Sequence, residues 1–131
     1  MGEPAAKEGD HIVAVDTHIV LIPAPPGPPV PTPLPSPFDG IINNNLSENV
    51  KIMGMFAATL GSMAENVPPH IPEGGPFQDP PTNQGQIIIG SPTVMINDKP
   101  AARNGDTAMT CNDPVDLPIG KVIAIGTVLI G

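Results

Sequence analysis

A short motif that occurs three times constrains this chain more than any other feature of its sequence. Residues 4–10 read PAAKEGD, residues 56–62 read FAATLGS, and residues 100–106 read PAARNGD. The second and third copies also align upstream without a gap, at an offset of 44 residues. Repetition of this kind indicates one supersecondary unit used several times. The fold is therefore expected to bring three equivalent turns together.

The sequence around each copy is typical of short β-strands. His11–Ile22 is rich in β-branched residues, and four shorter runs are bounded by Gly, Pro or Asn, which is typical of strands: Ile87–Ile89, Val94–Ile96, Val122–Ile125 and Val128–Ile130. The last run, residues 120–130, looks like a partial copy that lacks its downstream half. The segment that opens the chain could supply that half, which predicts a permuted ring of repeats.

One segment has a competing helical character. Ser47–Glu65 is rich in Met, Ala and Leu, and Asn45 or Ser47 could provide its N-cap. The repeat alignment nevertheless places Val50–Met53 over a strand of the third copy. We therefore expect a strand at Val50–Met53 and little helix in the protein.

Composition predicts a single domain, residues 1–131, with a thin core and stiff loops. The chain has 20 Pro, 14 Gly, three Phe and no Trp or Tyr, so large aromatic anchors are scarce. Because 40% of residues are hydrophobic and only 14% are charged, an ordered fold is favoured over disorder. Two proline-rich inserts, Pro23–Pro37 and Pro68–Pro81, are expected to be extended surface loops or, alternatively, docking strips for a partner. A domain of this kind usually needs a covalent or metal cross-link.

Charge and cysteine content exclude several functions. The net charge of −8 argues against binding to nucleic acid or to anionic membrane surfaces. One cysteine permits no intramolecular disulfide. The first ten residues are polar and acidic and lack the apolar stretch of a signal peptide. We therefore expect synthesis in the cytoplasm and any export by a route other than general secretion.

All the histidines and the cysteine follow a repeat glycine at short distance. His18 is nine residues past Gly9, His70 is nine past Gly61, and Cys111 is six past Gly105. Repeats arranged around one axis would bring these side chains together. Imidazoles and a thiolate form the closed tetrahedral shell that zinc adopts in structural sites. The sequence therefore predicts one structural zinc ion, held by loops from distant parts of the chain.

The fourth ligand is open between two residues. His11 directly follows the first repeat glycine and aspartate, and is the first choice. However, His11 and His18 are seven residues apart, so an unbroken strand would point them to opposite faces. A bend near Asp16 and Thr17 is needed if both bind one ion. Asp16 is otherwise the best substitute ligand, or the partner that orients an imidazole.

The stretch Gly90–Asp106 resembles the repeat that gives PAAR (Pro-Ala-Ala-Arg) proteins their name, and weaker copies lie at Pro4–Asp10 and Val50–Ser62. This resemblance implies a small, mostly β cone with pseudo-threefold symmetry and a zinc ion near its apex. The implied ligands are His11, His18, His70 and Cys111. It also implies a partner, the trimeric β-helical spike of a contractile injection system such as a type VI secretion system or a phage tail.

The predicted function is that of a structural spike tip, which sharpens the spike for membrane puncture and touches the target membrane only transiently. The alternatives are an adaptor that links effector cargo to the spike, a metal-free loop-rich domain, and, remotely, a small zinc hydrolase. An enzyme is disfavoured because all four soft ligands are used in the closed shell and no hydrolase motif is present. The spike-binding face is expected to be an apolar cone base that includes Ile87, Ile89, Val94, Ile96, Val128 and Ile130.

Overall fold

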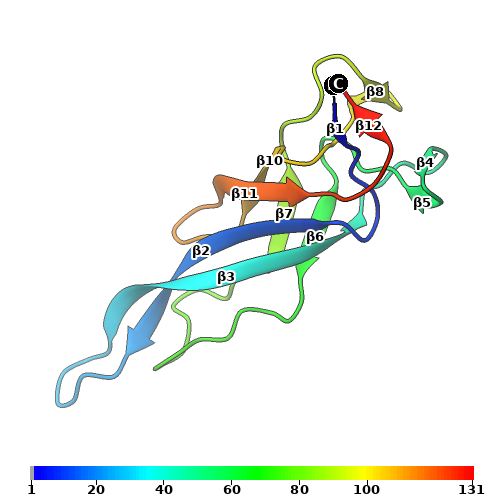
Figure 1. The fold of residues 1–131 in the computed structure, drawn as a ribbon. Coiled ribbons are helices and arrows are strands. Elements are labelled where there is room, and N and C mark those ends of the chain that lie inside the picture. Colours follow the sequence, from blue (N-terminus) through cyan, green and yellow to red (C-terminus); the bar gives the residue numbers. More distant parts are fainter. Residues whose placement is uncertain (1) are drawn as a thin grey trace.

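The computed structural model describes residues 2–131, and this part of the chain contains strands and no helix (Figure 1). None of it could therefore cross a membrane as a helix. The predicted mostly-β fold is confirmed. The strands are β1 (Glu3–Pro4), β2 (His11–Ile22), β3 (Val30–Asn44), β4 (Lys51–Ile52), β5 (Met55–Phe56), β6 (Met63–Asn66), β7 (Gln84–Ile87), β8 (Met95–Ile96), β9 (Lys99–Pro100), β10 (Thr107–Thr110), β11 (Leu117–Ile123) and β12 (Leu129–Ile130).

Six of these strands close into an antiparallel barrel in the order β10-β11-β2-β3-β6-β7. Its interior holds Phe38 and aliphatic side chains such as Ile12, Ile42, Ile87 and Val122, all at most 2% exposed. The helical alternative for Ser47–Glu65 is wrong, because that segment forms β4, β5 and the start of β6. The repeat register overrides local helix propensity there, since each strand has a paired partner.

The three copies of the motif meet in a triangle at the wide end of the molecule. The amide of Ala58 donates to the carbonyl of Ala6 (3.0 Å), Ala6 donates to Ala102 (2.9 Å), and Ala102 donates to Ala58 (3.1 Å). All three alanines are 0% exposed. The ring of hydrogen bonds explains the repeated alanine, because a larger side chain could not fit where three backbones approach.

A short hairpin extends from each corner of this triangle: β4–β5, β8–β9 and β12–β1. The third is built from the two ends of the chain, with Glu3 opposite Ile130. The predicted permuted ring of repeats is therefore confirmed. Ile52 and Ile130, at equivalent hairpin positions, pack with Ala5, Ala57 and Ala101 in a second small core beneath the triangle.

Each copy ends in the same tight turn. Gly9, Gly61 and Gly105 have φ values of 92°, 94° and 88°, a region that side chains with a Cβ rarely adopt. The residue after each glycine accepts a hydrogen bond from the backbone amide three residues earlier. Ser62 makes this bond through its hydroxyl, whereas Asp10 and Asp106 use a carboxylate. The departure of the second copy from the motif thus preserves the turn.

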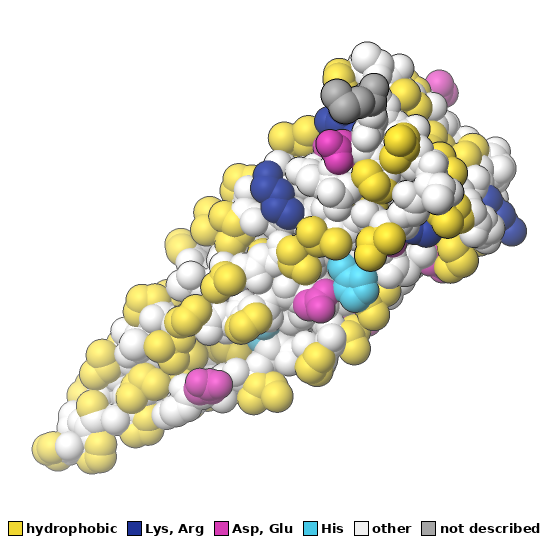
Figure 2. Space-filling model, viewed as in Figure 1, with side chains coloured by type: hydrophobic (Ala, Val, Ile, Leu, Met, Phe, Trp, Pro, Cys, Tyr) yellow, Lys and Arg dark blue, Asp and Glu magenta, His cyan; other side chains and the backbone are white. Residues whose placement is uncertain are grey.

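At the opposite end, the hairpin β2–β3 extends beyond the barrel, and the molecule tapers along it (Figures 1 and 2). Val30–Pro37 lies in this hairpin, so this half of the first proline-rich insert is a strand rather than the predicted loop. Prolines 31, 33, 35 and 37 are compatible with a strand because alternate residues direct their N–H groups to opposite edges. Their missing N–H groups face away from β2. The second insert has no strand of its own, as expected, apart from a bridge between Phe77 and Val20.

Candidate metal centre

Two of the site residues come from one strand. Asp16 and His18 lie two residues apart in β2, so their side chains share a face of the hairpin. That is the inward face, which Ile12 and Val20 also occupy. Asp16 is 0% exposed and His18 is 1% exposed. An anion with no solvent contact is costly unless it is paired or bound, so this carboxylate requires partners.

The other two residues come from segments far away in the sequence. His70 lies in the irregular segment after β6, and its amide donates to Asn83 Oδ1 (2.8 Å). Cys111 directly follows β10 and is 2% exposed. The His70 side chain is also only 2% exposed. The site therefore joins the projecting hairpin to two different parts of the barrel.

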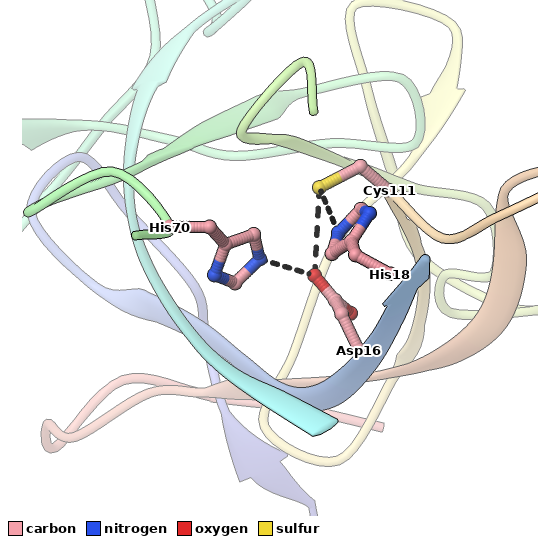
Figure 3. A group of neighbouring side chains, drawn as sticks. All are labelled: Asp16, His18, His70 and Cys111. Atoms are coloured by element: carbon pink, nitrogen blue, oxygen red, sulfur yellow. Dashed lines mark hydrogen bonds and ion pairs between the residues drawn. The ribbon is translucent and has the colours of Figure 1, made fainter. Parts of the chain in front are cut away.

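Figure 3 shows the four side chains converging on one point. His70 Nε2 lies 2.9 Å from Asp16 Oδ2, Cys111 Sγ lies 3.5 Å from the same oxygen, and Cys111 Sγ lies 3.6 Å from His18 Nε2. All four donor atoms lie within 4.8 Å of one another. Metal–ligand bonds of 2.0–2.3 Å in a tetrahedron place neighbouring donors about 3.3–3.8 Å apart. The spacing therefore fits a four-coordinate ion.

His11, the first choice for the fourth ligand, lies elsewhere. Its Nδ1 is 2.6 Å from Asp39 Oδ1 on the neighbouring strand, and its side chain is 44% exposed. The reason is the continuity of β2, which runs without a bend from His11 to Ile22. An unbroken strand points residues seven apart to opposite faces and residues two apart to the same face. The structure therefore places Asp16, the expected substitute, beside His18, His70 and Cys111.

Several polar residues that sequence reasoning missed hold Asp16 in place. The Thr110 hydroxyl and the Asn112 side-chain amide both donate to Asp16 Oδ1. Asn112 also accepts the amide of Thr17 through its Oδ1 (2.7 Å). Both residues flank Cys111, and this position beside a predicted ligand was the only signal in the sequence that could have identified them. Polar side chains on either side of a predicted ligand are natural candidates for orienting its neighbours.

A second polar group holds His70. Asn66 is 3% exposed, and its side-chain nitrogen lies 3.2 Å from His70 Nδ1. Its oxygen accepts the amide of Asp39 (2.9 Å), which fixes the orientation of the side-chain amide. Asn66 therefore donates to Nδ1, and Nε2 of His70 donates to Asp16 when no metal is bound.

The thiol of Cys111 is strongly perturbed. Burial, assisted by the negative charge of Asp16, raises the pKa of Cys111 to about 11. The metal-free protein therefore keeps the thiol protonated at neutral pH, as a donor toward Asp16. Metal binding must displace that proton, because the thiolate is the form that ligates.

One buried atom lacks a partner. His18 Nδ1 makes no hydrogen bond with any described residue, although Asp113 Oδ2 lies 3.5 Å away. A metal on Nε2 would fix the proton on Nδ1 and so orient this N–H toward the Asp113 carboxylate. The unsatisfied atom and the donor set of two imidazoles, a thiol and a carboxylate therefore fit a metal centre. Four protein ligands would leave no open position, as in structural zinc sites.

The expected spike-binding residues fall into three groups. Ile87 is 0% exposed inside the barrel, and Ile130 is 6% exposed in the core beneath the triangle, so neither side chain can face a partner. Val94 and Ile96 are half-buried against that second core. Ile89 and Val128 are exposed. The prediction that Ile87 and Ile130 lie on the spike-binding surface is therefore wrong. Alternate side chains of a strand point to opposite faces, and these two point inward.

The fold and the site define a class: a small all-β domain with a pseudo-threefold base and a buried four-residue centre able to bind a metal ion. Residues 77–131 match the family model described as PAAR motif. This match supports a PAAR-repeat protein, related to the spike tips of contractile injection systems. The matched segment contains the third copy and Cys111, and the ring of hydrogen bonds joins it to the two earlier copies. No curated protein matches the chain significantly.

Proposed function

We propose that this protein caps the end of a trimeric β-helical spike and sharpens it for membrane puncture. The observation that carries the proposal is the pseudo-threefold base. Its three motif copies are related by a cyclic set of hydrogen bonds, so one chain presents three equivalent hairpins. A threefold partner requires three similar contacts, and a single polypeptide of this form can make them all.

The chemistry of the base suits a stable protein contact. Exposed apolar side chains gather on its hairpins, including Met53 (54%), Met95 (62%) and Leu129 (58%). Met95 and Leu129 occupy equivalent positions in their hairpins. Large exposed apolar residues grouped on one face are typical of protein interfaces. The proposed partner is therefore a spike trimer whose end is apolar and threefold.

The metal centre would have a mechanical role in this function. The ligands join β2 to the segments around His70 and Cys111, at the point where the hairpin leaves the barrel. We propose that one zinc ion ties these segments together. Metal-binding free energy becomes folding free energy, which compensates for the thin core. The mixed nitrogen, sulfur and oxygen donor set favours zinc over metals that prefer oxygen alone.

The proposal places the protein at the spike apex, and it would leave the cell together with the spike. A hydrolytic role is disfavoured by the closed shell, because Asp16 occupies the place where a catalytic zinc would hold water. Cargo carriage uses the same fold, and no contact among the described residues favours it.

Reconstitution with a candidate spike trimer tests the proposal. Size-exclusion chromatography with light scattering should give one chain per trimer. Leu129→Glu, which adds a charge to the base, should abolish complex formation. Val15→Glu, at a residue of similar exposure (62%) on the projecting hairpin, is the matched control and should bind like the parent. Three chains per trimer, or full binding by Leu129→Glu, would overturn the proposed base contact.

A further inference from the structure

The hairpin β2–β3 carries a surface that the spike contact leaves unused. Residues 17–38 contain no Asp, Glu, Lys or Arg, although the chain as a whole is acidic. On the outward face, the odd-numbered residues of β2 from Val15 to Leu21 stand opposite the odd-numbered prolines of β3 from Pro31 to Pro37. We call this the outer hairpin face. Val15 is 62% exposed, and Val30 at the turn is 51% exposed.

The edges of this hairpin have almost no free backbone donors. On β2, three of the amides that point away from β3 are bonded: Thr17 to Asn112, Ile19 to Asp113 and Leu21 to the carbonyl of Pro76. On β3, the positions that point away from β2 are prolines, which have no N–H group. An ordinary free strand edge would expose a row of unpaired N–H groups.

The turn at the end of the hairpin continues this pattern. Residues 23–30 include five prolines, so only Ala24, Gly27 and Val30 have an N–H group. The amide of Gly27 donates to the carbonyl of Ala24 (2.9 Å). The turn itself is therefore uncharged and poor in hydrogen-bond donors, and Figure 2 shows hydrophobic side chains at the tip with one acidic side chain a short way behind it.

We infer that the outer hairpin face and its turn insert into the surface of a neutral lipid bilayer without help from the spike. A bilayer interior excludes charges and unpaired N–H groups, and this segment has no charge and few unpaired N–H groups, while the free carbonyls along the proline edge of β3 stay in contact with water at the bilayer surface. A protein strand is a poorer occupant, because an added strand needs donors as well as acceptors from the edge that it joins. The inference deepens the proposed function but is tested with no spike present.

The length of the hairpin limits the depth of insertion. Val15 to Ile22 spans roughly 23 Å at about 3.3 Å per residue, whereas the hydrocarbon core is about 30 Å thick. Glu73 is exposed in the loop beside the end of β2, where the neighbouring Gly74 approaches Ile22. The hairpin is therefore too short to cross the bilayer, and the charge of Glu73 opposes deep insertion of its end. The net charge of −8 predicts weaker binding when anionic lipid is added.

The chain contains no Trp, so a single introduced Trp reports its own surroundings by fluorescence without background. Val30→Trp places one reporter at the turn, and Ile125→Trp places a control at an exposed residue (78%) outside the hairpin. With phosphatidylcholine vesicles, the emission of the reporter at position 30 should shift to the blue and be quenched by lipids labelled in the acyl chain. The control should not change. Equal responses at both positions, or none at position 30, would refute the inference.

Vesicle flotation with charge variants completes the test. Val15→Glu combined with Val30→Glu should lower partitioning into phosphatidylcholine vesicles about tenfold or more, since charge on a lipid-facing surface is unfavourable. Glu73→Gln should increase it, and Ile125→Glu should leave it unchanged. Circular dichroism checks that each variant is folded. The lipid proposal is wrong if the parent protein does not float with any of the vesicles and instead forms dimers that the double variant abolishes. In that case a second copy of the chain covers this face.

Discussion

Replacing Asp16 by Asn should weaken metal binding, whereas replacing His11 by Gln should not. The amide introduced by Asp16→Asn keeps an oxygen for the Thr110 hydroxyl, but its NH2 group faces His70 Nε2 and the Cys111 thiol, so the stability of the metal-free variant is measured separately. The variant removes the anionic ligand from the centre. Mutation of residues that only orient a ligand costs 10–100-fold in metal affinity, so loss of a ligand should cost at least about 100-fold.

The consequence for stability follows from mass action. At free zinc 1,000 times the dissociation constant of the parent protein, binding stabilises the fold by about 4.1 kcal/mol. A site 100-fold weaker retains about 1.4 kcal/mol under the same conditions, a loss of about 2.7 kcal/mol. An unfolding entropy of about 2.1 cal/mol/K per residue over 131 residues converts this loss into a decrease in Tm of about 10 °C.

Elemental mass spectrometry and calorimetry provide the assay. The parent and His11→Gln should each contain about one zinc per chain and melt within about 4 °C of each other, because an exposed ion pair is worth at most about 1 kcal/mol. A chelator should lower the Tm of the parent by more than that of Asp16→Asn, and the excess is the contribution of the metal. Loss of zinc from His11→Gln, together with retention in Asp16→Asn, would refute the ligand set that the continuity of β2 imposes.

Three further predictions concern pH, turns and packing. In the presence of chelator, the protein should lose up to about 3 kcal/mol of stability between pH 9 and pH 11 relative to Cys111→Ser. The reason is that the thiol ionises near pH 9 in the unfolded chain, whereas burial raises its pKa in the folded protein to about 11. Parallel profiles of unfolding free energy against pH for the two proteins would contradict this. Gly105→Ala should cost about 1–2 kcal/mol in urea denaturation, since its φ of 88° is unfavourable although a Cβ there meets nothing within 4 Å. Ala58→Leu should cost about 1–3 kcal/mol or more by overpacking the centre of the triangle, and a stability equal to that of the parent would contradict the close approach of the three backbones there.

The local sequence determined the base of the molecule. The repeated alanines and glycines specify a turn that is the same in each copy, and their spacing predicts that the copies meet. The ring closed by β1 and β12 was predictable for the same reason, since each partial copy lacks what the other contains. His18, His70 and Cys111 were brought together correctly by this register.

Only the tertiary structure decided between Asp16 and His11, and between loop and strand for Val30–Pro37. The choice of ligand depends on whether β2 bends, and that is set by its twelve-residue pairing with β3 rather than by any residue near position 16. The prolines are equally compatible with a polyproline loop and with an edge strand, because both are extended. Pairing with a distant strand settles such cases, since hydrogen bonds and burial between segments are properties of the assembled fold and not of either segment alone.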